Sequence, residues 1–197
     1  VETWYDQSGN GNDATQSVAA GQPKIVDGGS LVAGGISSDG VDDIMNIVGS
    51  MGITGTVSRS IFAKLTPESN TLPDSYFFGI GDGTGGINDP ALHYNLSAEW
   101  AVRVQGGNEI YGSGTTSETV ISSIFNGTNV TDNKFFVNGS EITPTSSNAI
   151  ALNTDNTTQS IFGAITNANV SFDGKISTII IYPSDQSANR TAIESAI

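Results

Sequence analysis

Residues 4–16 read WYDQSGNGNDATQ, in which Trp4 and Tyr5 lead into a run of small and polar side chains. Gly9 and Gly11 can take the positive φ angles that tight turns require, and Asp6 and Ser8 can accept hydrogen bonds from nearby backbone N–H groups. The stretch therefore predicts a tight polar turn that directs the chain into the rest of the fold.

The same turn has half of the pattern of a calcium-binding loop. Counted from Asp6, oxygen-bearing residues stand at positions one, three and five and Gly11 at position six, as in an EF-hand, but the twelfth residue is Ser17 rather than a bidentate Glu. A calcium ion would need further carboxylates, either from Asp13 or from the turn between Asp39 and Asp43. Two interpretations stay open: a turn held only by its own hydrogen bonds, or a structural calcium site. The predicted ligands of that site are Asp6, Ser8, Asn10, Asp13, Asp42 and Asp43.

Beyond this turn, short runs of alternating apolar residues recur about every ten residues, separated by Gly, Asn, Asp and Ser. That pattern predicts an all-β fold, an antiparallel β-sandwich of the jelly-roll kind. The Asn138-Gly139 pair between two short runs is a strong hairpin signal. The predicted strands are 24–26, 44–48, 56–65, 75–80, 91–96, 100–105, 119–125, 134–137, 160–164 and 174–182.

The C-terminal stretch PSDQSANRTAIESAI is the one place where a helix is predicted. Pro183 ends the last strand, and Ser184 or Ser187 can cap a helix. Ala188, Ala192, Ile193 and Ile197 then fall on one face, which should dock on the sandwich.

Charge and length limit the classes of function. The net charge of −13 and the seven scattered Lys and Arg residues argue against nucleic-acid binding, and no apolar run is long enough to cross a bilayer. The chain has no Cys, so it holds no disulfide. At 197 residues it fits one domain, residues 1–197, and because it begins at Val1 with no leader we expect it to be part of a longer chain.

Three separated stretches resemble the laminin-G-like, concanavalin-A-like lectin/glucanase superfamily. They are WYDQSGNGNDATQ, SDGVDDIMNI (residues 38–47) and FDGKISTIIIYPSDQSANRTAIESAI (residues 172–197). The likeness is to modules found in secreted bacterial proteins and phage virion proteins, and it spans nearly the whole chain. It implies a concanavalin-A-like sandwich. It does not select a function, because that fold carries lectins, glycosidases, lyases and adhesion modules.

Catalytic signals are few. Glycosidases of this fold place paired carboxylates on one strand, whereas each of the seven Glu residues here lacks a second acid at strand spacing. Lyases of the fold need Tyr and His beside Arg and Gln, which leaves only a weak constellation around His93 and Tyr94. We therefore predict a protein that is not an enzyme.

A ligand-facing surface is predicted on the strand pair 91–105. Alternation places Trp100 and Val102 in the core and leaves His93, Asn95, Arg103 and Gln105 on the outward face. A solvated sheet face with no ligand explains the same pattern.

Two functions follow from these expectations. The first is a non-catalytic carbohydrate-binding or adhesion module of a secreted or surface protein, stabilised by calcium and binding a glycan or polysaccharide. The second is a structural decoration or fibre module of a virion or surface assembly, with apolar contacts to other copies or to its parent protein. Both place the chain outside the cell, on a cell surface or on a virion surface.

Overall fold

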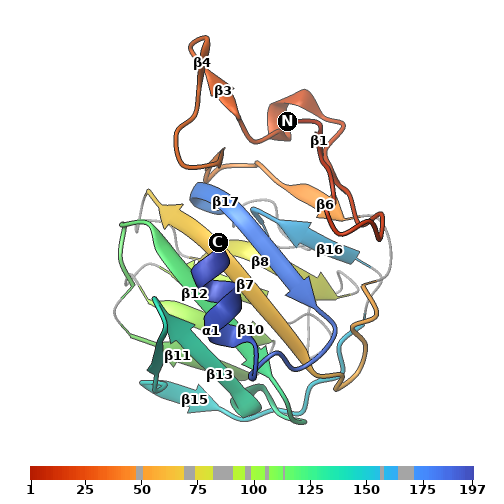
Figure 1. Ribbon diagram of the computed structural model, residues 1–197, viewed down its shortest axis with the longest axis vertical. Helices are drawn as coiled ribbons and strands as arrows, with labels where there is room; N and C mark the ends of the chain where they lie inside the picture. The colour runs from red at the N-terminus through yellow and green to blue at the C-terminus, as the bar shows by residue number, and fades with distance from the viewer. Residues whose placement is uncertain are drawn as a thin grey trace.

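The computed structural model describes residues 1–47, 51–68, 74–81, 91–95, 99–104, 107–112, 114–155, 158–163 and 171–197. These residues form an antiparallel β-sandwich with a short C-terminal helix on the outside of one sheet (Figure 1). The predicted fold class is confirmed.

The larger sheet contains both the entry turn and the predicted ligand face. In spatial order its strands in the described part of the chain are β1 (Thr3–Trp4), β2 (Ala14–Thr15), β6 (Met45–Ile47), β16 (Thr158–Ile161), β8 (Asp74–Gly81), β9 (Ala91–Asn95), β10 (Trp100–Val104), β11 (Gly107–Tyr111) and β15 (Ser146–Asn148).

The smaller sheet has the longest strands at its centre. Its order is β14 (Ser140–Ile142), β13 (Asn133–Val137), β12 (Thr119–Phe125), β7 (Arg59–Pro67), β17 (Asp173–Tyr182) and β5 (Ile36–Asp39). A separate hairpin of β3 (Val26–Asp27) and β4 (Ser30–Leu31) projects from the body at the top of Figure 1. In the part of the chain that the structure describes, the 3₁₀ turns η1 (Ala19–Gly21) and η2 (Val130–Asp132) lie in the connections.

The core forms where the inward side chains of the two sheets meet. Strand β7 contributes Ile61 and Leu65 at alternate positions, as strand pleating requires. Trp100 of the larger sheet is fully buried, and its ring centroid lies 6.4 Å from that of Phe135 in the smaller sheet. The prediction that Trp100 and Val102 point into the core is confirmed, since both are buried.

The Asn138-Gly139 turn joins β13 to β14, as predicted. Both residues have positive φ, 48° and 80°, and the register continues directly from Val137 to Ser140. This backbone geometry matches the hairpin turns whose twist suits antiparallel strands.

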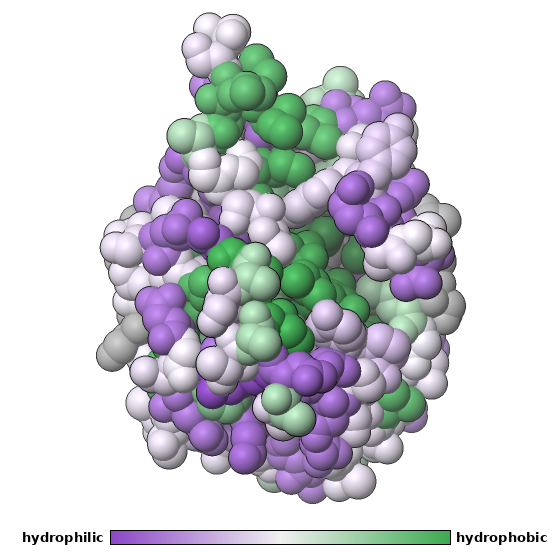
Figure 2. Space-filling model, in the orientation of Figure 1, coloured by the Kyte–Doolittle hydropathy of each residue, from purple (hydrophilic) through white to green (hydrophobic). Residues whose placement is uncertain are grey.

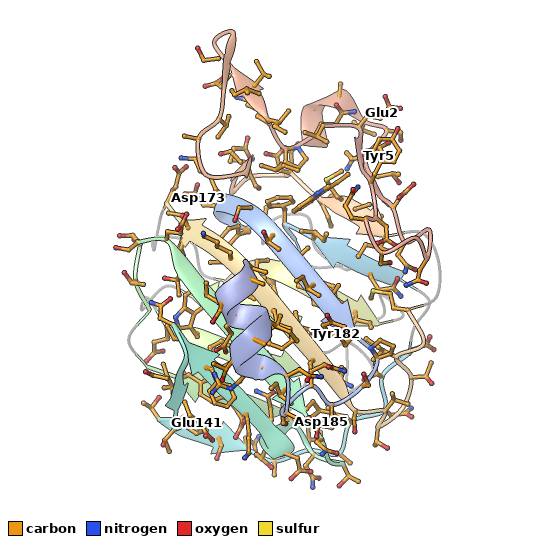
Figure 3. The ribbon with its side chains drawn as sticks, in the orientation of Figure 1. Glu2, Tyr5, Glu141, Asp173, Tyr182 and Asp185 are labelled. Carbon is orange, nitrogen blue, oxygen red and sulfur yellow. The ribbon has the colours of Figure 1, made fainter. Side chains whose placement is uncertain are left out.

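The C-terminal helix is shorter than the predicted one. Helix α1 spans Arg190–Ala196, and its N-cap residue, Asn189, makes no side-chain cap hydrogen bond, so the predicted cap at Ser184 or Ser187 is wrong. Ser187 instead donates its hydroxyl to Asp185 Oδ1 at 2.5 Å, which holds the preceding segment in a turn. Asp185 lies just beyond the end of β17 in Figure 3.

The helix docks by only part of the predicted apolar face. Ile193 and Ile197 are half-buried, whereas Ala188 and Ala192 are exposed, and no residue of α1 is fully buried. The contact is made by Arg190, whose guanidinium lies 4.0 Å from the Phe136 ring centroid, and by Glu194, which accepts a 2.6 Å hydrogen bond from Ser122 Oγ. Ion-paired side chains with apolar stems can cover a sheet face as an apolar stripe does.

Most predicted strands have an observed counterpart, with ends displaced by up to a few residues. The predicted strand over residues 24–26 is observed only as the two-residue β3 and a bridge at Lys24. The short strands β1, β2, β4, β5, β11 and β15 were not predicted as strands of their own. No helix of the described residues is long and apolar enough to cross a membrane.

Candidate functional site

The entry turn is held by the carboxylate of Asp6. Oδ1 accepts the Ser8 backbone N–H at 2.7 Å, and Oδ2 accepts the Ser8 hydroxyl at 2.8 Å and the Asn12 backbone N–H at 3.0 Å. Gly9 and Gly11 take φ of 82° and 76°, as predicted. The turn is closed at its base by Asp13, whose Oδ1 accepts the Asp6 backbone N–H at 2.8 Å.

These hydrogen bonds favour the ionised form of Asp6. The backbone N–H groups of Asn12 and Ser8 lower its pKa from 3.8 to about 2. Each carboxylate oxygen therefore already has protein donors, and Asp6 has a structural role in the turn.

The second part of the predicted calcium set lies at the turn after β5. One oxygen each of Asp39, Asp42 and Asp43 lie within 4.8 Å of one another, and within the described ranges this is the only such group of three or more His, Cys, Asp or Glu residues. Asp43 Oδ2 accepts the Asp39 backbone N–H at 3.0 Å, and Asp39 Oδ1 accepts the Val41 N–H at 2.9 Å. Oxygen ligands at this spacing suit a hard cation such as calcium.

Asp43 differs from its two neighbours because it is buried. It is 3% exposed, whereas Asp39 and Asp42 are exposed. Burial raises the pKa of Asp43, and the charges of Asp39 and Asp42 raise it further, against the Asp39 N–H hydrogen bond that lowers it. A divalent cation bound at this turn would relieve that repulsion.

The six predicted calcium ligands thus divide between two places. Asp6, Ser8, Asn10 and Asp13 share the entry turn, where Asn10 Nδ2 donates to Ser8 Oγ at 2.9 Å. Asp42 and Asp43 belong to the turn after β5, together with Asp39. Asp6 and Asp13 are not members of that three-carboxylate group, so the described residues form no single six-ligand set of the kind predicted.

The predicted ligand face lies on β9 and β10. The register pairs His93 with Ala101 and Tyr76, and Arg103 with Ala91 and Asn108. Paired positions of an antiparallel sheet share a face. Positions 93 and 103 therefore fall on the face opposite to the buried Trp100, as predicted.

The exposure of that face is uneven. Arg103 is exposed, but Ala101 on the same face is only 1% exposed, and Tyr76 is half-buried. Asn95 pairs with Asp74 at the strand end, and Gln105 lies outside the described residues. The structure thus describes Arg103 as an exposed cation on this face.

A chain of buried polar groups, which the sequence reasoning missed, links the two sheets. Tyr111 OH donates to Glu109 Oε2 at 2.5 Å, Asn133 Nδ2 donates to Tyr111 OH at 3.0 Å, and Ser123 Oγ donates to Asn133 Oδ1 at 2.7 Å. Burial raises the pKa of Glu109. The available signal was alternation: Glu109 and Tyr111 are two residues apart on β11, so an inward Tyr111 implies an inward Glu109.

Apolar side chains are exposed on the projecting β3–β4 hairpin. Ile25, Val26 and Leu31 are 48%, 50% and 77% exposed. Figure 2 shows a green area on the projection, below its paler tip. In Figure 3, Tyr5, which is 65% exposed, lies beside Glu2 on the neighbouring N-terminal segment.

Comparison with known proteins gives structural likeness without sequence likeness. No protein-family model matches the chain, and no curated protein sequence matches it. Among solved structures, the CBM40 module of the Ruminococcus gnavus IT-sialidase matches with a TM-score of 0.56 at 14% identity, over 71% of this chain and 84% of that one. The same module bound to α2,3-sialyllactose matches with a TM-score of 0.54 at 14% identity, over 73% and 84%.

A second group of matches consists of larger proteins. Trypanosoma rangeli sialidase matches with a TM-score of 0.66 at 16% identity, over 99% of this chain but only 31% of that one. At such identities the likeness establishes the fold, a lectin-like β-sandwich of the kind found in carbohydrate-binding modules, and not the function.

Proposed function

We propose that this chain is a non-catalytic carbohydrate-binding or adhesion module of the laminin-G-like, concanavalin-A-like kind, in a secreted or surface protein. The observation that carries the proposal is the match of its sandwich to carbohydrate-binding modules over more than two thirds of both chains. One of those modules has sialyllactose bound, so glycans that carry an anionic sugar are the first ligands to test.

The proposed binding surface is the outward face of β9 and β10, with His93, Asn95 and Arg103. The predicted ligand residue Gln105, which directly follows in the sequence, lies outside the described residues. Arg103 supplies the exposed cation, and an Arg fork can bind a sugar carboxylate through two parallel hydrogen bonds. The rest of the molecule carries a large negative charge and repels anions. Affinity for an anionic glycan should therefore depend on Arg103 more than on any general attraction.

Glycan-array screening, followed by calorimetry with α2,3- and α2,6-sialyllactose, tests the proposal. Arg103→Gln should weaken binding at least tenfold, because a charge-assisted pair is replaced by a neutral one. Lys24→Gln is the matched control: it removes one positive charge from an exposed side chain near the projecting hairpin, and binding should stay unchanged. A blank array, or equal losses in both variants, contradicts the proposed surface.

The absence of catalysis has its own test. Incubation with sialylated and anionic polysaccharides should release no product. Turnover that disappears in His93→Ala would instead establish lyase chemistry on the same face.

Calcium binding is proposed at the turn that holds Asp39, Asp42 and Asp43. Stabilisation by a ligand follows RT ln(1 + [L]/Kd), so calcium at a hundred times its Kd should add about 2.7 kcal/mol to the unfolding free energy. The thermal melt is compared in calcium and in chelator. Asp42→Asn should abolish the difference, whereas Asp27→Asn, which removes an exposed acid of the projecting hairpin, should keep it. An unchanged Tm on adding calcium contradicts the proposal.

The exposed apolar hairpin favours a second candidate function, a structural module of a virion or surface assembly. Ile25, Val26 and Leu31 expose an apolar surface of the kind that marks protein contacts. Light scattering coupled to size exclusion should then show concentration-dependent oligomers that Leu31→Ser dissociates. A monomer at all concentrations, together with glycan binding, favours the first function.

A further inference from the structure

Arg59, at the start of β7, points into the sandwich instead of into solvent. It stands at the same alternate positions as Ile61 and Leu65, and it is 5% exposed. Its guanidinium lies 4.4 Å from the ring centroid of Phe125, and Nη1 is 3.5 Å from the carbonyl oxygen of Val57. None of the described carboxylates forms an ion pair with it.

Arg190 provides an internal comparison. It also lies over a phenylalanine, 4.0 Å from the Phe136 ring centroid, but its Nη1 is 2.6 Å from Glu194 Oε2. The two arginines share the aromatic contact and differ in the carboxylate. Arg59 is therefore a buried charge whose contacts with the described residues include a ring and a long carbonyl hydrogen bond but no anion. Burial lowers its pKa to about 10, which still leaves it charged at neutral pH.

A cavity of about 20 Å³ adjoins Arg59 between the two sheets. Its polar lining consists of Arg59, Ser123 and Asn133, and the remaining lining side chains are apolar, among them Val102 and Phe125. A space of this size holds one water molecule or one small ion.

The lining suits an anion. Ser123 Oγ donates to the side-chain oxygen Oδ1 of Asn133, and the side-chain Nδ2 of Asn133 donates one of its two N–H groups to Tyr111 OH. The side-chain oxygen of Asn133 therefore already has a donor, and the second N–H of Nδ2 can donate to a ligand. No carboxylate lines the cavity. A single fixed positive charge, amide and guanidinium donors and apolar walls match one small monovalent anion.

We propose that this cavity is an internal binding site for a small monovalent anion of the chloride class, held by Arg59 and completed by Asn133. The bound anion would pair with the Arg59 guanidinium, which has no carboxylate partner among the described residues. A buried charge without a partner is destabilising. The site lies inside the sandwich and is separate from the glycan-binding face proposed above, so either proposal can fail without the other.

Crystallography in sodium bromide tests the site directly, without any variant. An anomalous bromide peak in the cavity, in contact with the Arg59 guanidinium, is the expected result. Bromide found only at the protein surface overturns the proposal.

Thermal and urea unfolding at constant ionic strength test it in solution, with chloride replaced stepwise by gluconate, which is too large for the cavity. Above the Kd, each tenfold rise in chloride should multiply the folding equilibrium constant of the wild-type chain tenfold. Arg59→Met should remove this dependence, and Arg190→Met, the matched control, should keep it. Equal chloride dependence in Arg59→Met and wild type, or none in wild type, overturns the proposal. If Arg59→Met does not fold, Arg59→Lys, which keeps the charge, should fold, and the chloride concentration at which it is half-maximally stabilised should differ from that of the wild type. The same chloride concentration in both proteins overturns the proposal.

Discussion

The Tyr111 hydroxyl is the central link of the buried polar chain, and Tyr111→Phe removes it while keeping the ring. The ring stacks on Phe135 with centroids 4.6 Å apart, and that contact stays. Two buried groups lose their partner: the Glu109 carboxyl, to which the hydroxyl donates at 2.5 Å, and the Asn133 amide, from which it accepts at 3.0 Å. Each buried unsatisfied group costs about 1–3 kcal/mol. The variant should therefore lose about 2–6 kcal/mol, a large share of the stability of an ordinary domain.

The assay is urea unfolding followed by circular dichroism at pH 7. Tyr182→Phe is the control, because Tyr182 lies on β17 with its ring edge-on to Phe62 at 6.2 Å and is only half-buried (Figure 3). It should change stability by no more than about 0.5 kcal/mol. If the unfolding free energy of Tyr111→Phe lies within about 0.5 kcal/mol of the wild-type value, the reasoning is refuted. Such a result would mean that the Tyr111 hydroxyl contributes no stabilising hydrogen bonds.

The pH dependence of the Tyr111→Phe loss follows from Glu109. Its folded pKa is already raised by burial, and the Tyr111 hydrogen bond opposes that rise. Without the hydroxyl the pKa rises further, so the variant binds a proton more readily in the folded state. The stability difference from wild type should therefore shrink as the pH falls below the folded pKa of the variant.

Three further outcomes are expected. Gly35→Ala should lower the free energy of unfolding in urea by ~3 kcal/mol or more, because a Cβ at position 35 would lie 2.3 Å from the Ile176 carbonyl oxygen and the residue has a φ of 122°. Gly29→Ala should cost only about 1–2 kcal/mol, because Gly29 has a φ of 83° but no atom lies within 4 Å of a Cβ placed there. Equal losses in the two variants would refute this expectation. Because burial raises the folded pKa of Glu109 above 4.5, Glu109 contributes stability that is fully present below about pH 4.5 and is lost as the pH rises through the folded pKa. Glu109→Gln should therefore remove this pH dependence from the free energy of unfolding. If the pH dependence is unchanged in the variant, another group causes it. The Asp6 carboxyl should titrate near pH 2 when followed by NMR. Its contribution to stability is present above about pH 4 and should disappear as the pH falls through 2. A midpoint near 3.8 would show that the hydrogen bonds of the turn do not form in solution.

Local sequence signals predicted the parts of the fold that depend on local backbone chemistry. The Asn138-Gly139 hairpin and the Gly9 and Gly11 turn were predicted because positive φ is a property of the residue itself. The long central strands were predicted because alternation over several residues records which face is buried. Short strands such as β15 escaped prediction, because three exposed residues carry no alternation and pair only by contact with β11.

The candidate sites divide in the same way. That Arg103 points outward followed from the alternation of Trp100 and Val102. That Asp6 and Asp13 do not join the carboxylate group of Asp39, Asp42 and Asp43 depends on how residues distant in the sequence pack, which sequence spacing does not reveal.

The sequence by itself determined the class of fold, the acidic character and the turns, because these follow from side-chain polarity, charge and backbone preference residue by residue. Only the tertiary structure decided which buried polar groups meet. Glu109, Tyr111, Asn133 and Ser123 come from three strands of two sheets and form one hydrogen-bonded chain. The interior position of Arg59 beside a cavity arises in the same way. Desolvation and pairing are properties of the assembled interior, where the energy of a polar group depends on its neighbours in space and not on its neighbours in the chain.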